Sequence, residues 1–395
     1  MEFAKRRAKL NARPLCRGYQ WAFNYYCFLL LGDVLAVQPL GGKKTDFVSV
    51  HDGRVIDQLE GEAIARLGPN AILLRVSEED VYLASYQEGC VRRIPLKLEP
   101  GHVCDGGYGS DAGVFAINVF DKSQPGEWQL YTLLIDMAGE AVSVVFRSNE
   151  IICTEAMSSD GRYVLAIVKL GRTYEGRVYD CAQNPPKMIF RGRRGDLYPS
   201  IWLPGSETRR FAAKRNWTDC GFDGFIYDID SGDRSALLSG APISAWGALS
   251  PDGRLLPLWP QSPKDKRGAV VMRCETGEMM HTGIIHEGGS YVPFVWTPSS
   301  QRALIQHRQD WYDPSGWPPP EVSSEALSVM DLGTMEITQL DLDVPVGKAR
   351  AWVDENRFVF IGGFMGYGRS ERYGGLEALS DDHIYLADLS EAVPT

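Results

Sequence analysis

Short runs of apolar and β-branched residues alternate along the chain with compact polar turns, and helical periodicity is almost absent. Such runs, bounded by turn residues, are typical of β-strands. Many of them close on an acidic residue followed by small or turn-forming residues, as in Asp136-Met137-Ala138-Gly139. This turn returns about every 45 to 57 residues, at Asp180, Asp230, Glu275, Asp331 and Asp388, with looser copies at Asp52 and Glu88. A period of this size predicts an architecture of repeated structural units.

A second turn recurs in phase with the first. Ser158-Ser159-Asp160-Gly161-Arg162 aligns with Ser250-Pro251-Asp252-Gly253-Arg254 and with Thr297-Pro298-Ser299-Ser300-Gln301, and degenerate copies follow Trp202 and Trp352. Proline presets one backbone dihedral of a tight turn, and Asp-Gly accepts the left-handed ones. Each copy precedes a short apolar run. One unit therefore reads as strand a, this turn, strand b, a longer loop, strand c ending at the acidic turn, and strand d.

Four antiparallel strands in 40 to 50 residues form the blade of a β-propeller. With these two turns the chain resembles the TolB-type and WD-repeat-like propellers over roughly residues 25–390. The resemblance implies a fold and leaves the function open. We therefore expect an all-β protein, a single closed β-propeller of four-stranded antiparallel blades. The acidic turns predict eight blades, and seven would also fit because the second unit is short.

The domain organisation follows from this reading. Residues 1–14 are expected to form a basic N-terminal tail, and residues 15–395 the propeller. Few residues follow Asp388, so the last blade needs a strand from elsewhere, and Leu15 to Trp21 is the candidate. Such a strand removes an exposed sheet edge.

Composition narrows the function classes. The net charge of −10 argues against a nucleic-acid partner. Eight dispersed cysteines, with no C-x-x-C and no Cys/His group at metal spacing, favour buried thiols in a reducing compartment, so we expect a cytoplasmic protein. The apolar stretch Tyr25 to Leu31 is too short for a membrane span.

The longest variable segments are the b–c loops of six successive units. Their ranges are 121–127, 169–176, 215–222, 260–268, 308–324 and 362–382. In a propeller blade these loops emerge on one side, and insertions on one side of a repeat protein often mark a binding face. Tyr, Trp and Arg dominate protein interfaces, and they recur here. The predicted binding residues are Tyr174, Trp217, Arg308, Trp311, Tyr312, Trp317, Tyr367 and Arg372. The same aromatic residues could instead fold back onto the blades as structural plugs.

Known catalytic motifs are missing from the sequence. It has no G-x-S-x-G, H-E-x-x-H or P-loop motif. The glycine-rich stretch 362–368 lacks the following helix that a dinucleotide loop requires. We expect no cofactor and no metal site. Weak catalytic candidates are His102, His307, Asp310, Tyr312 and Arg350. His102, near Asp105 and Asp111, could line a central channel or belong to a satisfied turn network.

The leading hypothesis is a non-enzymatic propeller that binds a protein or peptide partner through the aromatic- and arginine-rich b–c loop side. The alternative is an enzyme or small-molecule binder with its site at the channel mouth on the same side. A third reading is a sensor domain that works beside a separate catalytic partner.

Overall fold

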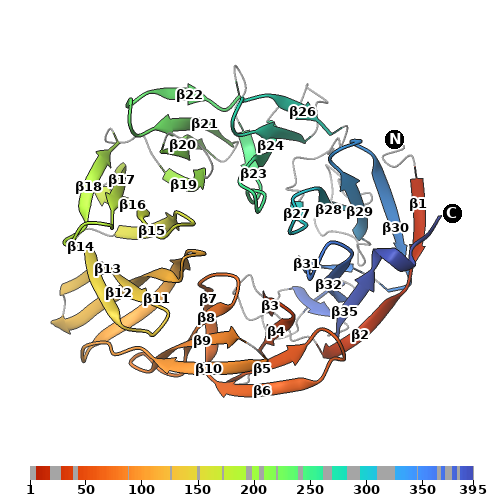
Figure 1. The fold of residues 1–395 in the computed structure, drawn as a ribbon, viewed down its shortest axis with the longest axis horizontal. Helices are drawn as coiled ribbons and strands as arrows, with labels where there is room; N and C mark the ends of the chain where they lie inside the picture. Colours follow the sequence, from red (N-terminus) through yellow and green to blue (C-terminus); the bar gives the residue numbers. More distant parts are fainter. Residues whose placement is uncertain are drawn as a thin grey trace. The chain divides into compact units, whose positions relative to one another are not determined.

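The computed structural model describes most of the chain as β-strands. It covers residues 6–17, 28–38, 43–87, 89–124, 127–148, 152–170, 173–192, 198–203, 209–218, 221–238, 243–260, 269–282, 294–308, 325–344, 346–362, 366–369, 376–379 and 383–394. Apart from a 3-10 turn, η1 (Leu389–Glu391), every regular element within these ranges is a strand. They form eight four-stranded blades (Figure 1). The predicted all-β propeller fold with eight blades is confirmed.

Two compact units divide the described chain. One comprises residues 43–45 and 57–244 and contains blades 2 to 5. Blade 2 is β7 (Glu62–Arg66), β8 (Ala71–Arg75), β9 (Val81–Gln87) and β10 (Cys90–Pro95); blade 3 is β11 (His102–Gly109), β12 (Val114–Gln124), β13 (Glu127–Asp136) and β14 (Ala141–Ser148). Blade 4 is β15 (Ile152–Met157), β16 (Tyr163–Leu170), β17 (Thr173–Asp180) and β18 (Lys187–Arg191); blade 5 is β19 (Tyr198–Leu203), β20 (Arg210–Thr218), β21 (Gly221–Asp228) and β22 (Arg234–Ala236).

The other unit comprises residues 1–42, 46–56 and 245–395, and holds most of blades 1 and 6 and all of blades 7 and 8. Blade 1 is β3 (Phe28–Leu31), β4 (Val34–Val37), β5 (Lys44–Ser49) and β6 (Val55–Glu60); blade 6 is β23 (Ile243–Trp246), β24 (Leu255–Pro260), β25 (Val270–Arg273) and β26 (Met279–His281). Blade 7 is β27 (Phe294–Trp296), β28 (Arg302–Arg308), β29 (Glu325–Asp331) and β30 (Ile337–Leu342); blade 8 contains β31 (Val346–Trp352), β32 (Arg357–Gly362) and β35 (His383–Asp388). Each of the eight third strands ends at or beside the acidic turn that predicted it.

The N-terminal segment completes two of these sheets. Strand β2 (Ala12–Arg17) pairs antiparallel with β35 and supplies the fourth strand of blade 8. Strand β1 (Arg6–Leu10), in the region expected to be a basic tail, pairs parallel with β30 of blade 7, and β36 (Val393–Pro394) pairs with β1 in turn. Ala8 and Leu10 alternate with exposed Arg7 and Lys9, so the basic residues face outward while the apolar ones pack inward. The closing strand expected at Leu15 to Trp21 lies partly outside the described residues.

The turns between strands a and b have the chemistry that the sequence indicates. In blade 4 the Ser158 hydroxyl donates to Asp160 at 2.5 Å and accepts from the Tyr163 backbone N–H at 2.8 Å. In blade 6 Ser250 makes the same two bonds, to Asp252 at 2.6 Å and from Leu255 at 2.9 Å. The glycine of each turn, Gly161 and Gly253, has a φ near +73° and +72°, a left-handed conformation that favours glycine.

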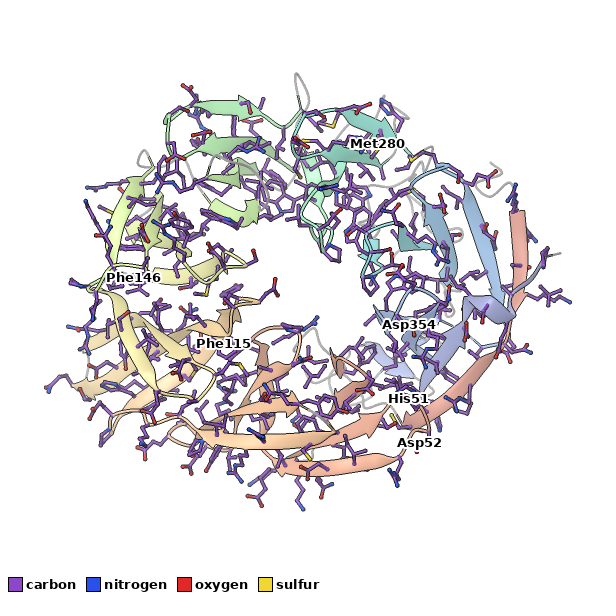
Figure 2. All side chains as sticks on the ribbon, viewed as in Figure 1. His51, Asp52, Phe115, Phe146, Met280 and Asp354 are labelled. Carbon is purple, nitrogen blue, oxygen red and sulfur yellow. The ribbon has the colours of Figure 1, made fainter. Side chains whose placement is uncertain are left out.

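The hydrophobic core lies between successive blades. Figure 2 labels Phe115 and Phe146, which lie on opposite faces of blade 3: Phe115 packs in the cluster shared with blade 2, and Phe146 in the cluster shared with blade 4. In the other unit, separate clusters join blade 6 to 7, blade 7 to 8, and blade 8 to blade 1. Blades 3, 4, 7 and 8 therefore each contribute two apolar faces. Inner strands are accordingly apolar, and β4 is buried along its whole length.

The cysteines fit the predicted pattern in part. Cys16, Cys90, Cys104, Cys181 and Cys274 are free; Cys104 and Cys274 are buried, as expected, but Cys90 is exposed. Burial raises the pKa of the Cys104 thiol to about 12, so this thiol stays protonated and unreactive.

Candidate functional site

The middle strands of blades 3, 4 and 5 are longer than their neighbours and project as three hairpins on the b–c side. In blade 3 the pairing of β12 with β13 continues to Gln124 and Glu127, whereas β11 stops opposite Asp121. In blade 4 it continues to Leu170 and Thr173, beyond the last partner in β15, which faces Val168. In blade 5 it continues to Thr218 and Gly221, past the last partner in β19, opposite Lys214.

We call this surface the hairpin face; it consists of residues 121–124, 127–129, 169–170, 173–176, 214–218 and 221–223. These segments were expected to be loops, but most of their described residues are strand extensions. The a–b turns of blades 3 and 4 lie side by side, because the backbone N–H of Asp111 donates to the backbone carbonyl of Ser159 at 2.9 Å. The b–c hairpins of the two blades therefore lie together at the opposite end. The three hairpins come from consecutive blades that pack together, so they form one surface.

A buried carboxylate holds two arginines at the base of the blade 4 hairpin. Glu175 is 2% exposed, and its Oε1 accepts from Nε of Arg177 at 2.7 Å and from Nε of Arg191 at 2.9 Å. Burial disfavours the charged carboxylate, but the hydrogen bonds from the two arginines outweigh burial and lower the pKa of Glu175. The Arg191 side chain remains 58% exposed. The cluster therefore keeps one net positive charge and presents it to solvent.

The position of this cluster follows from strand alternation. Glu175, Arg177 and Tyr179 lie two residues apart on β17 and so share one face of the blade. On that face Tyr179 packs against Phe146 of blade 3, with ring centroids 5.1 Å apart. The arginine cluster thus lies above the junction of blades 3 and 4, at the hairpin face.

A second polar network lies on the face of blade 3 that packs against blade 2, opposite the face that carries Phe146. Tyr131 and His102 lie 2.8 Å apart, from the phenol oxygen to Nδ1, and Nε2 of His102 is 3.2 Å from Oδ1 of Asp121. Hydrogen bonds from Ser123 lower the pKa of the Asp121 carboxyl, so it accepts and Nε2 carries the proton. In a neutral ring Nδ1 then accepts from the Tyr131 hydroxyl. Burial raises the pKa of the Tyr131 phenol, so this group stays protonated as a donor.

The partners of His102 differ from those expected from the sequence. Its side chain is buried in the polar network of blade 3, and both ring nitrogens are engaged there, with Tyr131 and Asp121 rather than with Asp105 or Asp111. Of the other catalytic candidates, His307 lies on β28 and Arg350 on β31. Asp310 and Tyr312 lie outside the described residues.

The predicted binding residues divide into three groups. Tyr174 is partly buried in the blade 4 hairpin, opposite Lys169. Trp217, Arg308 and Tyr367 lie on strands, β20, β28 and β33 (Gly366–Arg369) respectively. Trp311, Tyr312, Trp317 and Arg372 lie outside the described residues. The long b–c segment of blade 8 carries a hairpin of its own, in which β33 pairs with β34 (Leu376–Leu379).

Sequence reasoning missed Glu175, Arg177, Arg191, Tyr131 and the role of Asp121. A usable signal was present for the arginine cluster. Residues 169–215 contain eleven Lys and Arg but four Asp and Glu, a net charge of +7 within a chain of net charge −10. Local charge excess of this kind marks a binding surface more directly than the overall balance.

Among the described residues no group of three or more His, Cys, Asp or Glu side chains is arranged to hold a metal ion. The same residues include no helix with the length and hydrophobicity needed to cross a bilayer.

Comparison with known proteins gives a fold and no family. No protein-family model and no curated protein matches the sequence. Among solved structures, the oligogalacturonate lyase of Vibrio parahaemolyticus is 12% identical with a TM-score of 0.50, over 95% of this chain and 99% of that chain. A eukaryotic initiation factor is 9% identical with a TM-score of 0.51, over 96% and 89%. The dihydro-heme d1 dehydrogenase NirN is 13% identical with a TM-score of 0.51, over 78% and 63%.

These similarities concern the fold alone. The resemblance to TolB-type and WD-repeat-like propellers is confirmed at the level of architecture by the four-stranded blades of the structure. Because the similar structures include a lyase, a dehydrogenase and an initiation factor, the fold does not select a function for this chain.

Proposed function

We propose that this chain is a non-enzymatic β-propeller module that binds a protein or peptide partner through its hairpin face. The observation that carries the proposal is the projection of three consecutive hairpins, from blades 3, 4 and 5, beyond the flanking strands. Projecting hairpins on a rigid sheet scaffold offer a preorganised surface, which lowers the entropic cost of binding. Tyr174 and Trp217 lie on two of these hairpins, and Tyr and Trp are frequent hot-spot residues.

Affinity capture from the source organism tests this proposal. The baits are wild-type protein, the double variant Tyr174→Ala/Trp217→Ala, and Val142→Ala as a matched control on an exposed position of β14, where the side chain is 53% exposed. We expect a protein enriched by the wild type and the control to disappear from the capture with the double variant. Identical captures with all three baits would refute a role for the hairpin face.

The buried network around His102 supports a second candidate, a small-ligand or catalytic site on the same side. A histidine between a carboxylate and a phenol is an arrangement that can relay a proton. Thermal-shift screening of small molecules against wild type and His102→Gln tests it. A compound that stabilises the wild type and not the variant would favour this candidate over the binding module.

We also propose a reducing compartment such as the cytoplasm. The support is five cysteines that are free in the structure, of which Cys90 is exposed.

A further inference from the structure

We infer that the hairpin face of blade 4 receives an acidic peptide segment of the partner, with Arg191 and Arg177 as the groups that contact its carboxylates. This inference rests on the proposed function and names the chemistry of the partner. It starts from the charge distribution, since the region 169–215 carries +7 while the whole chain carries −10.

The arginine cluster has the geometry for carboxylate recognition. Each guanidinium donates to Glu175 through Nε and so uses one of its N–H donors in this contact. A guanidinium has five N–H donors and pairs carboxylates in a two-bond geometry. Arg191 is 58% exposed, so its remaining donors are accessible to a second carboxylate.

Glu175 preorganises these donors. Because it is buried and bonded to both arginines, it fixes two long side chains that would otherwise lose rotamer entropy on binding. It also neutralises one of their two charges, so it competes electrostatically with the incoming acid. Removal of its charge is therefore expected to strengthen binding of an anion, whereas removal of Arg191 is expected to weaken it.

The sequence around the cluster is basic. Arg193 and Arg194 follow Arg191 after one glycine, and Lys169 and Arg172 precede Glu175 in the chain. Outside this region the chain is acidic, which opposes a long polyanion such as RNA that continues past the basic surface. A short acidic segment of a protein is confined to the basic region, and we therefore favour it as the ligand.

Fluorescence anisotropy with a labelled twelve-residue peptide of alternating Glu and Gly tests the inference. We expect Arg191→Gln to weaken binding about tenfold, the effect of one lost charge-assisted contact, and Glu175→Gln to strengthen it severalfold. Lys187→Gln is the matched control: it removes the same charge from the other end of β18, at an exposed position, and should leave the affinity unchanged. Binding should weaken with added salt.

Several outcomes would overturn the inference. They are equal affinities of wild type and Arg191→Gln, weaker binding by Glu175→Gln, and no preference over a peptide with Gln in place of Glu. Tighter binding of a twelve-nucleotide uridine RNA, lost in Arg191→Gln, would assign the surface to RNA instead. The two proposals can fail separately. If capture of a partner depends on Trp217 but not on Arg191, the binding-module proposal stands and the acidic-segment inference is refuted.

Discussion

Two tryptophans at equivalent positions tie each of two blades to the blade before it. The indole N–H of Trp296 at the end of β27 donates to the backbone carbonyl of Ala248 at 2.8 Å, and that of Trp352 at the end of β31 donates to Val295 at 2.7 Å. Both rings are buried. Each tryptophan thus combines a large apolar contact with a hydrogen bond across a blade junction.

Trp296→Ala should lower the free energy of unfolding by about 3–5 kcal/mol, because it leaves a cavity at the junction of blades 6 and 7. Trp296→Phe keeps much of the packing and loses the hydrogen bond, so about 1–2 kcal/mol is expected. Urea denaturation followed by circular dichroism measures both values. A loss below about 1 kcal/mol for the alanine variant would show that the ring does not hold the junction.

At the scale of elements, strand β1 covers the edge of blade 7. Leu10 is 2% exposed and packs in the cluster between blades 7 and 8, while the parallel pairing with β30 occupies backbone groups that would otherwise form a free edge. Leu10→Ala should lower the free energy of unfolding by about 2–4 kcal/mol, measured by urea denaturation. Lys9→Ala, on the exposed face of the same strand, should change it by less than about 0.5 kcal/mol. Equal effects would mean that β1 does not pack as described.

Removal of residues 1–11 extends this test to the edge itself. The truncated protein should self-associate through the exposed β30, as light scattering after gel filtration would show. A monomeric truncated protein would argue that this edge needs no cover.

The elements show what the sequence could and could not predict. The acidic turns located all eight third strands, because turn chemistry is local: the carboxylates of Asp136 and Asp180 each accept from the backbone N–H two residues later. Strand β1 was missed because its pairing partner Ile337–Leu342 lies more than 300 residues away. The cluster of Glu175 and Arg191 was missed because the pairing of β17 with β18 brings these residues together. Their spacing along the chain does not reveal that contact. Closure of the propeller into one ring stays a prediction.

For the whole molecule, several carboxylates make stability depend on pH. Hydrogen bonds from arginine lower the pKa of Asp180 and of Asp230, and those from Arg177 and Arg191 lower that of Glu175 against its burial. A lowered pKa stabilises the fold above the ordinary values, 3.8 for Asp and 4.5 for Glu, and this stability is lost as the pH falls through the lowered value. Melting temperatures should therefore change little from pH 7 to about 5 and fall steeply below about pH 4.

Scanning calorimetry between pH 7 and 3 checks this expectation. Asp180→Asn removes the negative charge and one of the two oxygens that accept from Arg162. It should start from a lower melting temperature at pH 7 and show a shallower acid decline. Lys187→Gln carries no carboxyl change and should follow the wild-type curve. A decline for Asp180→Asn as steep as that of the wild type would contradict the assignment.

The pairing of β1 with β30, and of β2 with β35, also sets an order in time for biosynthesis. Arg6 meets Thr338, and Arg17 meets His383, so the ribosome makes each early strand more than 300 residues before its partner. At roughly 5–20 residues per second this delay is about 15–70 seconds. Blades 2 to 5, which use only neighbouring strands, can fold during that interval, and protease resistance of ribosome-stalled chains would reveal this. Throughout it Leu10 lacks its native contacts, which come from blades 7 and 8, so the nascent chain carries an apolar N-terminal segment that chaperones can recognise until the last two blades emerge.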